Sequence, residues 1–156
     1  MSASTDDVKQ SWLPMVIIAM GQIQMSLNIN ALPVSSGGIV AEFNVAPTTV
    51  GTAIVAYSLG VAGFIMLGAK LGQVFGSLRV FRAATLTLMI AVTLVTFSPN
   101  AIVLILGQLL AGLAAAVIVP TLVVLIANNY RGKQQATCLG MLGSVQAAAT
   151  VTAFFM

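Results

Sequence analysis

Apolar residues fill five long stretches of this 156-residue chain, and turn-forming or charged residues separate the stretches. A helix needs about 20 apolar residues to cross the hydrocarbon core of a bilayer. The sequence predicts spanning helices at about 12–33, 48–69, 80–97, 101–127 and 136–156. The pattern therefore indicates an all-α membrane protein, a bundle of about five transmembrane helices over residues 12–156, with a cytoplasmic tail at 1–11.

The expected connections are rich in residues that favour turns. A polar segment that begins with Ser35-Ser36-Gly37-Gly38 is predicted between the first two helices. Ser98-Pro99-Asn100 is typical of a tight turn, so the third and fourth helices should be antiparallel neighbours.

Composition narrows the class of protein. Hydrophobic residues make up 59% of the chain and charged residues 6%, whereas a soluble domain carries about 25% charged residues. A soluble bundle with apolar core helices is therefore strongly disfavoured, and a net charge of +3 without a basic cluster does not indicate a nucleic-acid site. With one Cys, no His and no pair of carboxylates within a helix, the sequence predicts neither an enzyme, nor a metal site, nor a cofactor.

The six cationic residues indicate the orientation. Five expected helices place all of them on one side of the membrane: Lys9, Lys70, Arg79, Arg82, Arg131 and Lys133. The opposite connections contain Glu42 and no Lys or Arg. Because positive charge marks the cytoplasmic side, we expect a multi-pass protein of the cell membrane, or cell inner membrane, with a cytoplasmic N-terminus.

The first helix is unusually polar for a membrane span. At 100° per residue, Gln22, Ser26 and Asn30 form one stripe, and Gln24 and Asn28 form another on roughly the opposite side. Polar groups in hydrocarbon are costly, so both stripes should be covered by protein or by a water-filled cavity. They could line a substrate cavity or join helices by hydrogen bonds; we expect at least one stripe to line a cavity.

Small and polar residues recur in the other helices. Gly68 and Gly72 form a GxxxG pair in the second helix, a pattern that allows close helix packing. The fourth helix has one polar residue, Gln108, among Gly and Ala, and the fifth has Gln146 and Thr150 four residues apart. Most of these residues should serve packing.

Three segments resemble the N-terminal part of a major facilitator superfamily transporter, nearest the fourteen-helix drug:proton antiporter branch. Residues 24–33, which end in Ala31-Leu32-Pro33, resemble that branch's first-helix signature, and 56–59 resemble the aromatic-Leu segment of its second helix. Residues 71–81, LGQVFGSLRVF, resemble the glycine-rich charged loop between the second and third helices. This resemblance implies a conformational-switch loop that includes Gly72, Gln73, Gly76 and Arg79.

The chain is neutral at positions where the family carries charge. Gln24, Gln73 and Gln108 stand where the resemblance implies an acid, an acid and a membrane-buried Arg. Val151-Thr152 stand about where the fifth helix of the antiporters has Gly-Pro. Glutamine can hydrogen-bond but cannot titrate, so proton antiport through the usual residues is not expected.

Together these features predict secondary export or exchange of a small organic compound by alternating access. The expected cavity residues are Gln24, Asn28, Asn30 and Gln108. Because five helices are fewer than one six-helix half, we expect a fragment of a longer transporter that lies in the lipid bilayer and acts with the missing C-terminal part or a second copy. The alternatives are a non-transporting membrane protein, either a degenerate paralogue or an assembly partner, and a channel.

Overall fold

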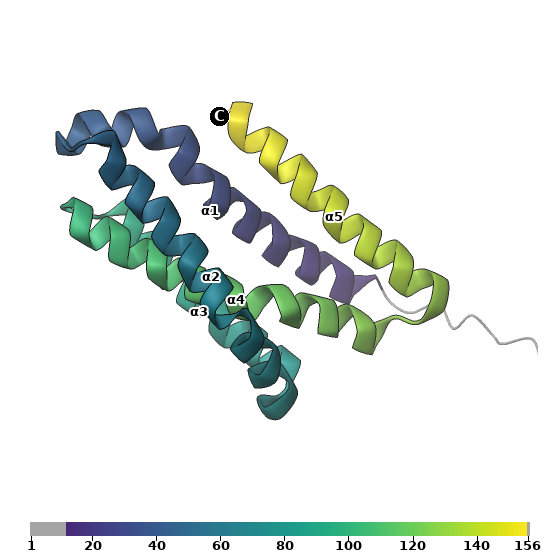
Figure 1. The fold of residues 1–156 in the computed structure, drawn as a ribbon. Coiled ribbons are helices and arrows are strands. Elements are labelled where there is room, and N and C mark those ends of the chain that lie inside the picture. The colour runs from purple at the N-terminus through teal and green to yellow at the C-terminus, as the bar shows by residue number, and fades with distance from the viewer. Residues whose placement is uncertain (1–11, 156) are drawn as a thin grey trace, which may run out of the picture.

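The computed structural model describes residues 12–155, which form five long helices joined by short connections (Figure 1). The predicted tail at 1–11 and the last residue, Met156, lie outside the described residues. The helices are α1 (Leu13–Phe43), α2 (Pro47–Phe75), α3 (Ser77–Thr96), α4 (Ala101–Asn129) and α5 (Gly132–Phe155). All five are long and apolar enough to cross a membrane, so the predicted helical membrane bundle is confirmed.

Helix α1 ends ten residues later than the sequence predicts, at Phe43 rather than at 33. It continues beyond Pro33 through the Ser-Gly segment that was predicted to be a polar connection, and it ends before Asn44, whose φ of 48° is left-handed. Figure 1 shows α1 changing direction in its last third. The extension is stabilised by tertiary packing, because Ile39 and Val40 pack against the buried side chains of Leu32 and Val50. This burial outweighs a cost of about 1 kcal/mol for each helical glycine.

The predicted loop after α2 is almost entirely helical. Helix α2 runs to Phe75 and α3 starts at Ser77, which leaves Gly76 as the connection. Gly76 has φ 89° and ψ 127°, a conformation that is open to glycine and strained for other residues. Helix α5 likewise starts earlier than predicted, at Gly132 rather than 136.

Helix α4 is the centre of the bundle and packs closely against α2 and α3. Its buried face is built largely from small residues, and glycines on both partners allow the backbones of α2 and α4 to touch. An added Cβ at Gly68 would lie 2.8 Å from Cα of Val117, and one at Gly112 would meet the carbonyl group of Tyr57. The predicted role of the α2 glycines in packing therefore applies to Gly68.

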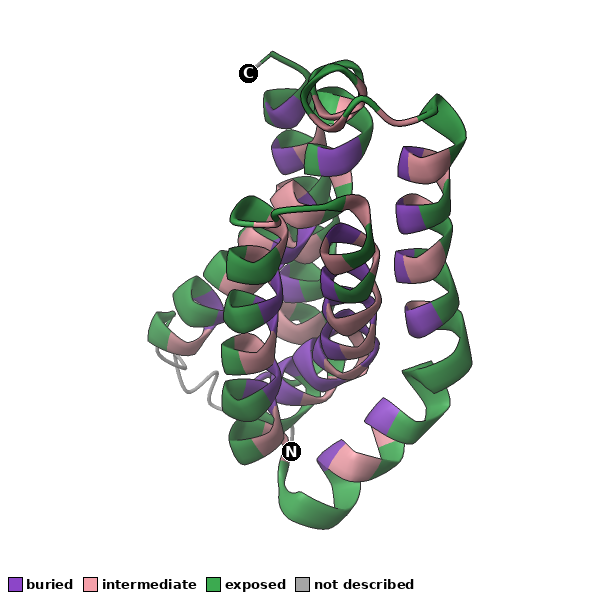
Figure 2. Ribbon diagram, turned by 90° about the vertical axis from the view of Figure 1, so that its left-hand side faces the viewer, coloured by how far each residue is buried: buried purple, intermediate pink, exposed green. Residues whose placement is uncertain are grey.

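Helix α5 lies beside α1, away from the α2–α4 core (Figure 1). Figure 2 shows that buried residues occupy the inward faces of the helices, whereas the outward faces are exposed. Many exposed side chains are large and apolar, as a lipid-facing surface requires; examples are Leu59, Met66, Ile102 and Phe154.

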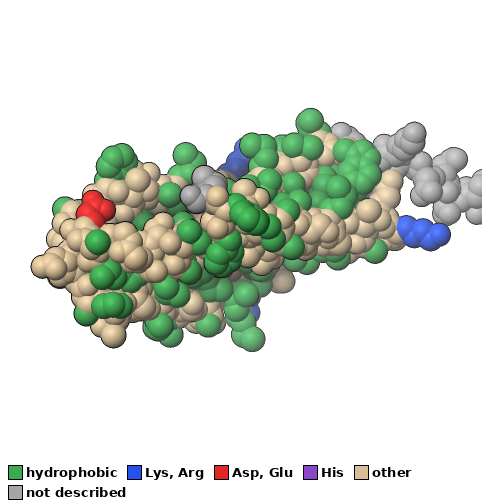
Figure 3. Space-filling view, turned by 90° about the horizontal axis from the view of Figure 1, so that it is seen from above, with side chains coloured by type: hydrophobic (Ala, Val, Ile, Leu, Met, Phe, Trp, Pro, Cys, Tyr) green, Lys and Arg blue, Asp and Glu red, His purple; other side chains and the backbone are tan. Residues whose placement is uncertain are grey.

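Within the described residues, positively and negatively charged side chains lie at different positions along the length of the molecule. Lys70, Arg79 and Arg82 lie near the α2–α3 connection, and Arg131 and Lys133 lie at the α4–α5 connection. The α2–α3 connection and the end of α4 border one shared cavity, so these cations belong to the same end of the bundle. Figure 3 shows acidic atoms near the opposite end from the outermost basic atoms.

Candidate functional site

A cavity of about 500 Å³ lies between α1, α3 and the start of α4. Three of the predicted residues line it: Gln24 and Asn28 from α1, and Gln108 from α4. The sequence could place Gln24 and Asn28 on one face of α1, and the tertiary structure adds Gln108 from a helix about 80 residues later. We name this cavity the amide cavity.

The amide cavity combines an apolar wall with a few polar groups. The wall consists of Leu27, Leu32, Ile39, Phe43, Val92, Val95 and Leu104. Glu42 lines the cavity and carries its one charge among the described residues, and Thr96 and Ser98 add hydroxyl groups at the α3–α4 end. The volume and the mixed lining are typical of a site for a small organic molecule.

The amide groups in this cavity retain unused hydrogen-bonding capacity. The Nδ2 atom of Asn28 is buried and has no hydrogen-bond partner among the described residues. The side chains of Gln24 and Gln108 likewise make no hydrogen bond to a described residue, although Gln108 is only 3% exposed. Leaving a buried amide unpaired costs about 1–3 kcal/mol, so a ligand or ordered water that accepts a hydrogen bond would be stabilised here.

Asn30 was predicted to line a substrate cavity, and it is not among the residues that line the amide cavity. Its Nδ2 atom lies 2.7 Å from the carbonyl oxygen of Ser26 and 3.3 Å from Oγ1 of Thr150 in α5. On the same stripe, Nε2 of Gln22 donates to Oε1 of Gln146 at 3.2 Å. This stripe of α1 therefore joins α1 to α5, because its amides meet the polar face of α5 rather than open space.

The cavity residues predicted from the sequence do not include four polar residues that line the amide cavity: Ser35, Glu42, Thr96 and Ser98. Ser35, Glu42 and Ser98 lie in predicted connections, where a polar residue is unremarkable, and Thr96 lies at the end of the predicted third helix. Gln22 was predicted to lie on a polar stripe of the first helix, and the structure shows that the partners of this stripe are Gln146 and Thr150 of α5.

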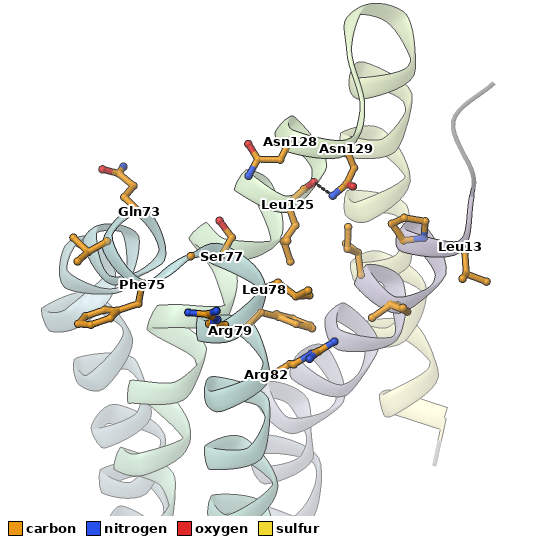
Figure 4. A pocket seen from close by; sticks show the side chains of 16 residues that line it. Leu13, Gln73, Phe75, Ser77, Leu78, Arg79, Arg82, Leu125, Asn128 and Asn129 are labelled. Atoms are coloured by element: carbon orange, nitrogen blue, oxygen red, sulfur yellow. Dashed lines mark hydrogen bonds between the residues drawn. The ribbon is translucent and has the colours of Figure 1, made fainter. Parts of the chain in front are cut away.

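The predicted conformational-switch residues lie at the opposite end of the bundle from the amide cavity, and Figure 4 shows Gln73 and Arg79 there. Gln73, Gly76 and Arg79 line a second cavity of about 870 Å³ between the starts of α1 and α3 and the ends of α2 and α4. Gly72 is buried in α2, where an added Cβ would lie 3.5 Å from Oγ1 of Thr121 in α4. We name this second cavity the basic pocket.

Neutral Gln73 changes the electrostatics of the basic pocket. Arg79 and Arg82 line it, and the described residues supply no acidic partner there. Neither arginine makes a hydrogen bond or ion pair with a described residue. The pocket is therefore positively charged on one side.

Comparison with known proteins gives a consistent family match. A family model described as Major Facilitator Superfamily matches residues 16–156. The chain is 24% identical to the riboflavin transporter RibZ of Clostridioides difficile, over 88% of this chain and 30% of that protein. It is 29% identical to the multidrug transporter mfsC of Aspergillus fumigatus, over 83% of this chain and 26% of that protein. It is 26% identical to the puromycin resistance protein pur8 of Streptomyces alboniger, over 86% of this chain and 27% of that protein.

The chain thus spans about 30% or less of the length of these curated relatives. No solved structure matches it.

Proposed function

The chain belongs to the Major Facilitator Superfamily, and on this premise we propose that it forms the N-terminal part of a secondary transporter. The transporter exports or exchanges a small organic compound by alternating access, and the amide cavity is this part's contribution to the substrate site. Further helices complete the translocation path, since the relatives are more than three times as long as the matched region. The N-terminus is cytoplasmic, because the described cations gather at one end of the bundle.

The observation that carries the proposal is the convergence of Gln24, Asn28 and Gln108 on one cavity. Their amides supply hydrogen-bond donors and acceptors without a titratable proton. A compound with a carbonyl or similar acceptor would satisfy the buried Nδ2 atom of Asn28, and its apolar part would lie on the wall formed by residues such as Leu27 and Val95. The cavity reaches Glu42, so it opens toward the end away from the cations.

The proposal is tested by transport in proteoliposomes that contain the complete natural reading frame. A panel of carbonyl-containing organic compounds, including riboflavin and puromycin, serves as probes because the names of two relatives mention these compounds. Replacement of Gln108 by Leu keeps the approximate size of the side chain but removes its capacity to hydrogen-bond a substrate, and Asn28→Ala removes the unpaired donor. Each should raise the apparent KM by about tenfold or more, the effect of losing about 1.5 kcal/mol of hydrogen bonding.

Thr150→Val is the matched control, since Thr150 is a polar helical residue outside the amide cavity. It should lower stability slightly and leave the KM unchanged. If none of the compounds moves although the protein inserts and folds, the transport proposal fails. If Gln108→Leu reduces insertion as much as transport, Gln108 is a packing residue.

A non-transporting assembly partner is the second candidate. It is favoured by the neutral residues at three positions where the family resemblance implies charge, Gln24, Gln73 and Gln108. The same proteoliposomes discriminate the two functions: an assembly partner would give no substrate movement by itself and would co-purify with another membrane protein from native membranes.

A further inference from the structure

The basic pocket has two contrasting walls. Arg79 and Arg82 stand three residues apart on α3 and so share a face, and Figure 4 shows Arg82 extending toward α1. Facing them is an apolar wall to which Leu13 and Ile17 of α1, and Leu125 of α4, contribute. The pocket can therefore hold a molecule with a charged part and an apolar part.

The positive charge of the pocket is not balanced within the described residues. Both arginine side chains are exposed and make no ion pair or hydrogen bond there. The start of α3 adds to this charge, because Gly76 provides no side-chain cap and the first residues of the helix line the pocket. Free N–H groups at a helix start carry partial positive charge, so both features attract an anion.

The position of the pocket limits the source of that anion. It lies at the ends of four membrane-spanning helices, where a helix meets the layer of lipid headgroups. A soluble anion would be stabilised by the positive charge of the arginines, but it would leave the apolar wall of the pocket uncovered. A phospholipid satisfies both walls, because its phosphate reaches the arginines while an acyl chain covers the wall on α1 and α4.

We propose that the basic pocket binds the headgroup of an acidic phospholipid, such as phosphatidylglycerol, through Arg79 and Arg82. The phosphate diester lies between the two guanidinium groups, and the first acyl carbons lie against Leu13 and Ile17. The site is separate from the amide cavity, so the lipid is a bound structural partner rather than the transported compound. Because the pocket is lined by both sides of the α2–α3 connection, the lipid holds that connection against α1 and α4.

The test compares the lipids that stay bound to the full-length protein in native mass spectrometry. The protein is equilibrated in mixed micelles with equal amounts of phosphatidylglycerol and phosphatidylcholine. We expect preferential retention of phosphatidylglycerol. An arginine near an anionic lipid contributes about fivefold in affinity, so the double variant R79Q/R82Q should lower the affinity for phosphatidylglycerol about 30-fold.

Two further double variants separate the site from general charge and from misfolding. R131Q/K133Q removes the same charge at the same end of the bundle but outside the pocket, and it should change the affinity less than about twofold because exposed charges at a distance are screened. R79K/R82K keeps the charge and should retain most of the binding. Both variants should have the same thermal unfolding midpoint as the parent protein.

Three outcomes would overturn the proposal. Equal losses in R79Q/R82Q and R131Q/K133Q would show attraction to general charge rather than a site. Displacement of the lipid by millimolar inorganic phosphate would assign the pocket to a soluble anion. Equal retention of phosphatidylcholine and phosphatidylglycerol would show that the arginines do not select the headgroup. None of these results bears on transport through the amide cavity, so the two proposals can fail independently.

Discussion

Replacing Gly112 by Ala tests whether direct backbone contact holds α2 against α4. A Cβ at this position would meet the carbonyl oxygen of Tyr57, and it would lie 3.0 Å from the carbonyl carbon and 3.1 Å from Cα of the same residue. These are backbone atoms of a packed helix, so no side-chain rotation can relieve the overlap. The two helices must move apart instead.

The size of this movement gives the expected cost. Carbon atoms pack at about 3.5–4.0 Å, so the helices must separate locally by about 0.5–1 Å, and a gap of that size forfeits about a quarter to a half of the dispersion energy between facing atoms. Overpacked cores lose about 1–3 kcal/mol. We expect the upper end of this range, about 3 kcal/mol, because the obstructing atoms belong to the backbone.

The measurement is the free energy of unfolding in detergent micelles, followed by loss of helical circular dichroism during titration with sodium dodecyl sulfate. Gly63→Ala is the control on the partner helix, since a Cβ there meets nothing within 4 Å. The combined variant with Gly68→Ala should cost less than the sum of the two single changes, because helices already separated at one point have less contact to lose. If Gly112→Ala unfolds at the same midpoint as Gly63→Ala, the close α2–α4 contact is not what stabilises the bundle.

Two further changes test the α2–α3 connection and the α1–α5 interface. Gly76→Ala should lower the free energy of unfolding by about 1–3 kcal/mol, because a φ of 89° is strained for alanine. If Gly76→Ala unfolds at the same midpoint as the control Gly63→Ala, the connection adopts another conformation. Gln146→Leu removes the hydrogen-bond partner of Gln22 in α1 and should weaken the packing of α5 against α1 by about 1 kcal/mol. The assay is maleimide labelling of Cys138, the single cysteine, whose side chain is fully buried on α5. Because local opening of α5 exposes this thiol, labelling should be about fivefold faster in Gln146→Leu than in the parent protein. An unchanged labelling rate would show that the Gln22–Gln146 hydrogen bond does not hold α5 in place.

The candidate site was only partly predictable from the polar residues of the first helix. Periodicity places Gln24 and Asn28 on one face and Asn30 on another, but it does not say which neighbour each face meets. The structure assigns the first face to the amide cavity and the second to Thr150 of α5. The sequence could not make this distinction, because a cavity and an interhelical hydrogen bond require the same polar residue types.

The sequence by itself determined that the chain forms five helices long and apolar enough to cross a membrane and that the cations of the described residues share one end, since both properties depend on length, hydropathy and order along the chain. Tertiary structure alone decided that α1 continues through Pro33 and the Ser-Gly segment to Phe43. It also reduced the predicted loop after α2 to Gly76. In both places the local propensity favours a turn, and packing against other helices contributes more free energy than a few unfavourable residues cost.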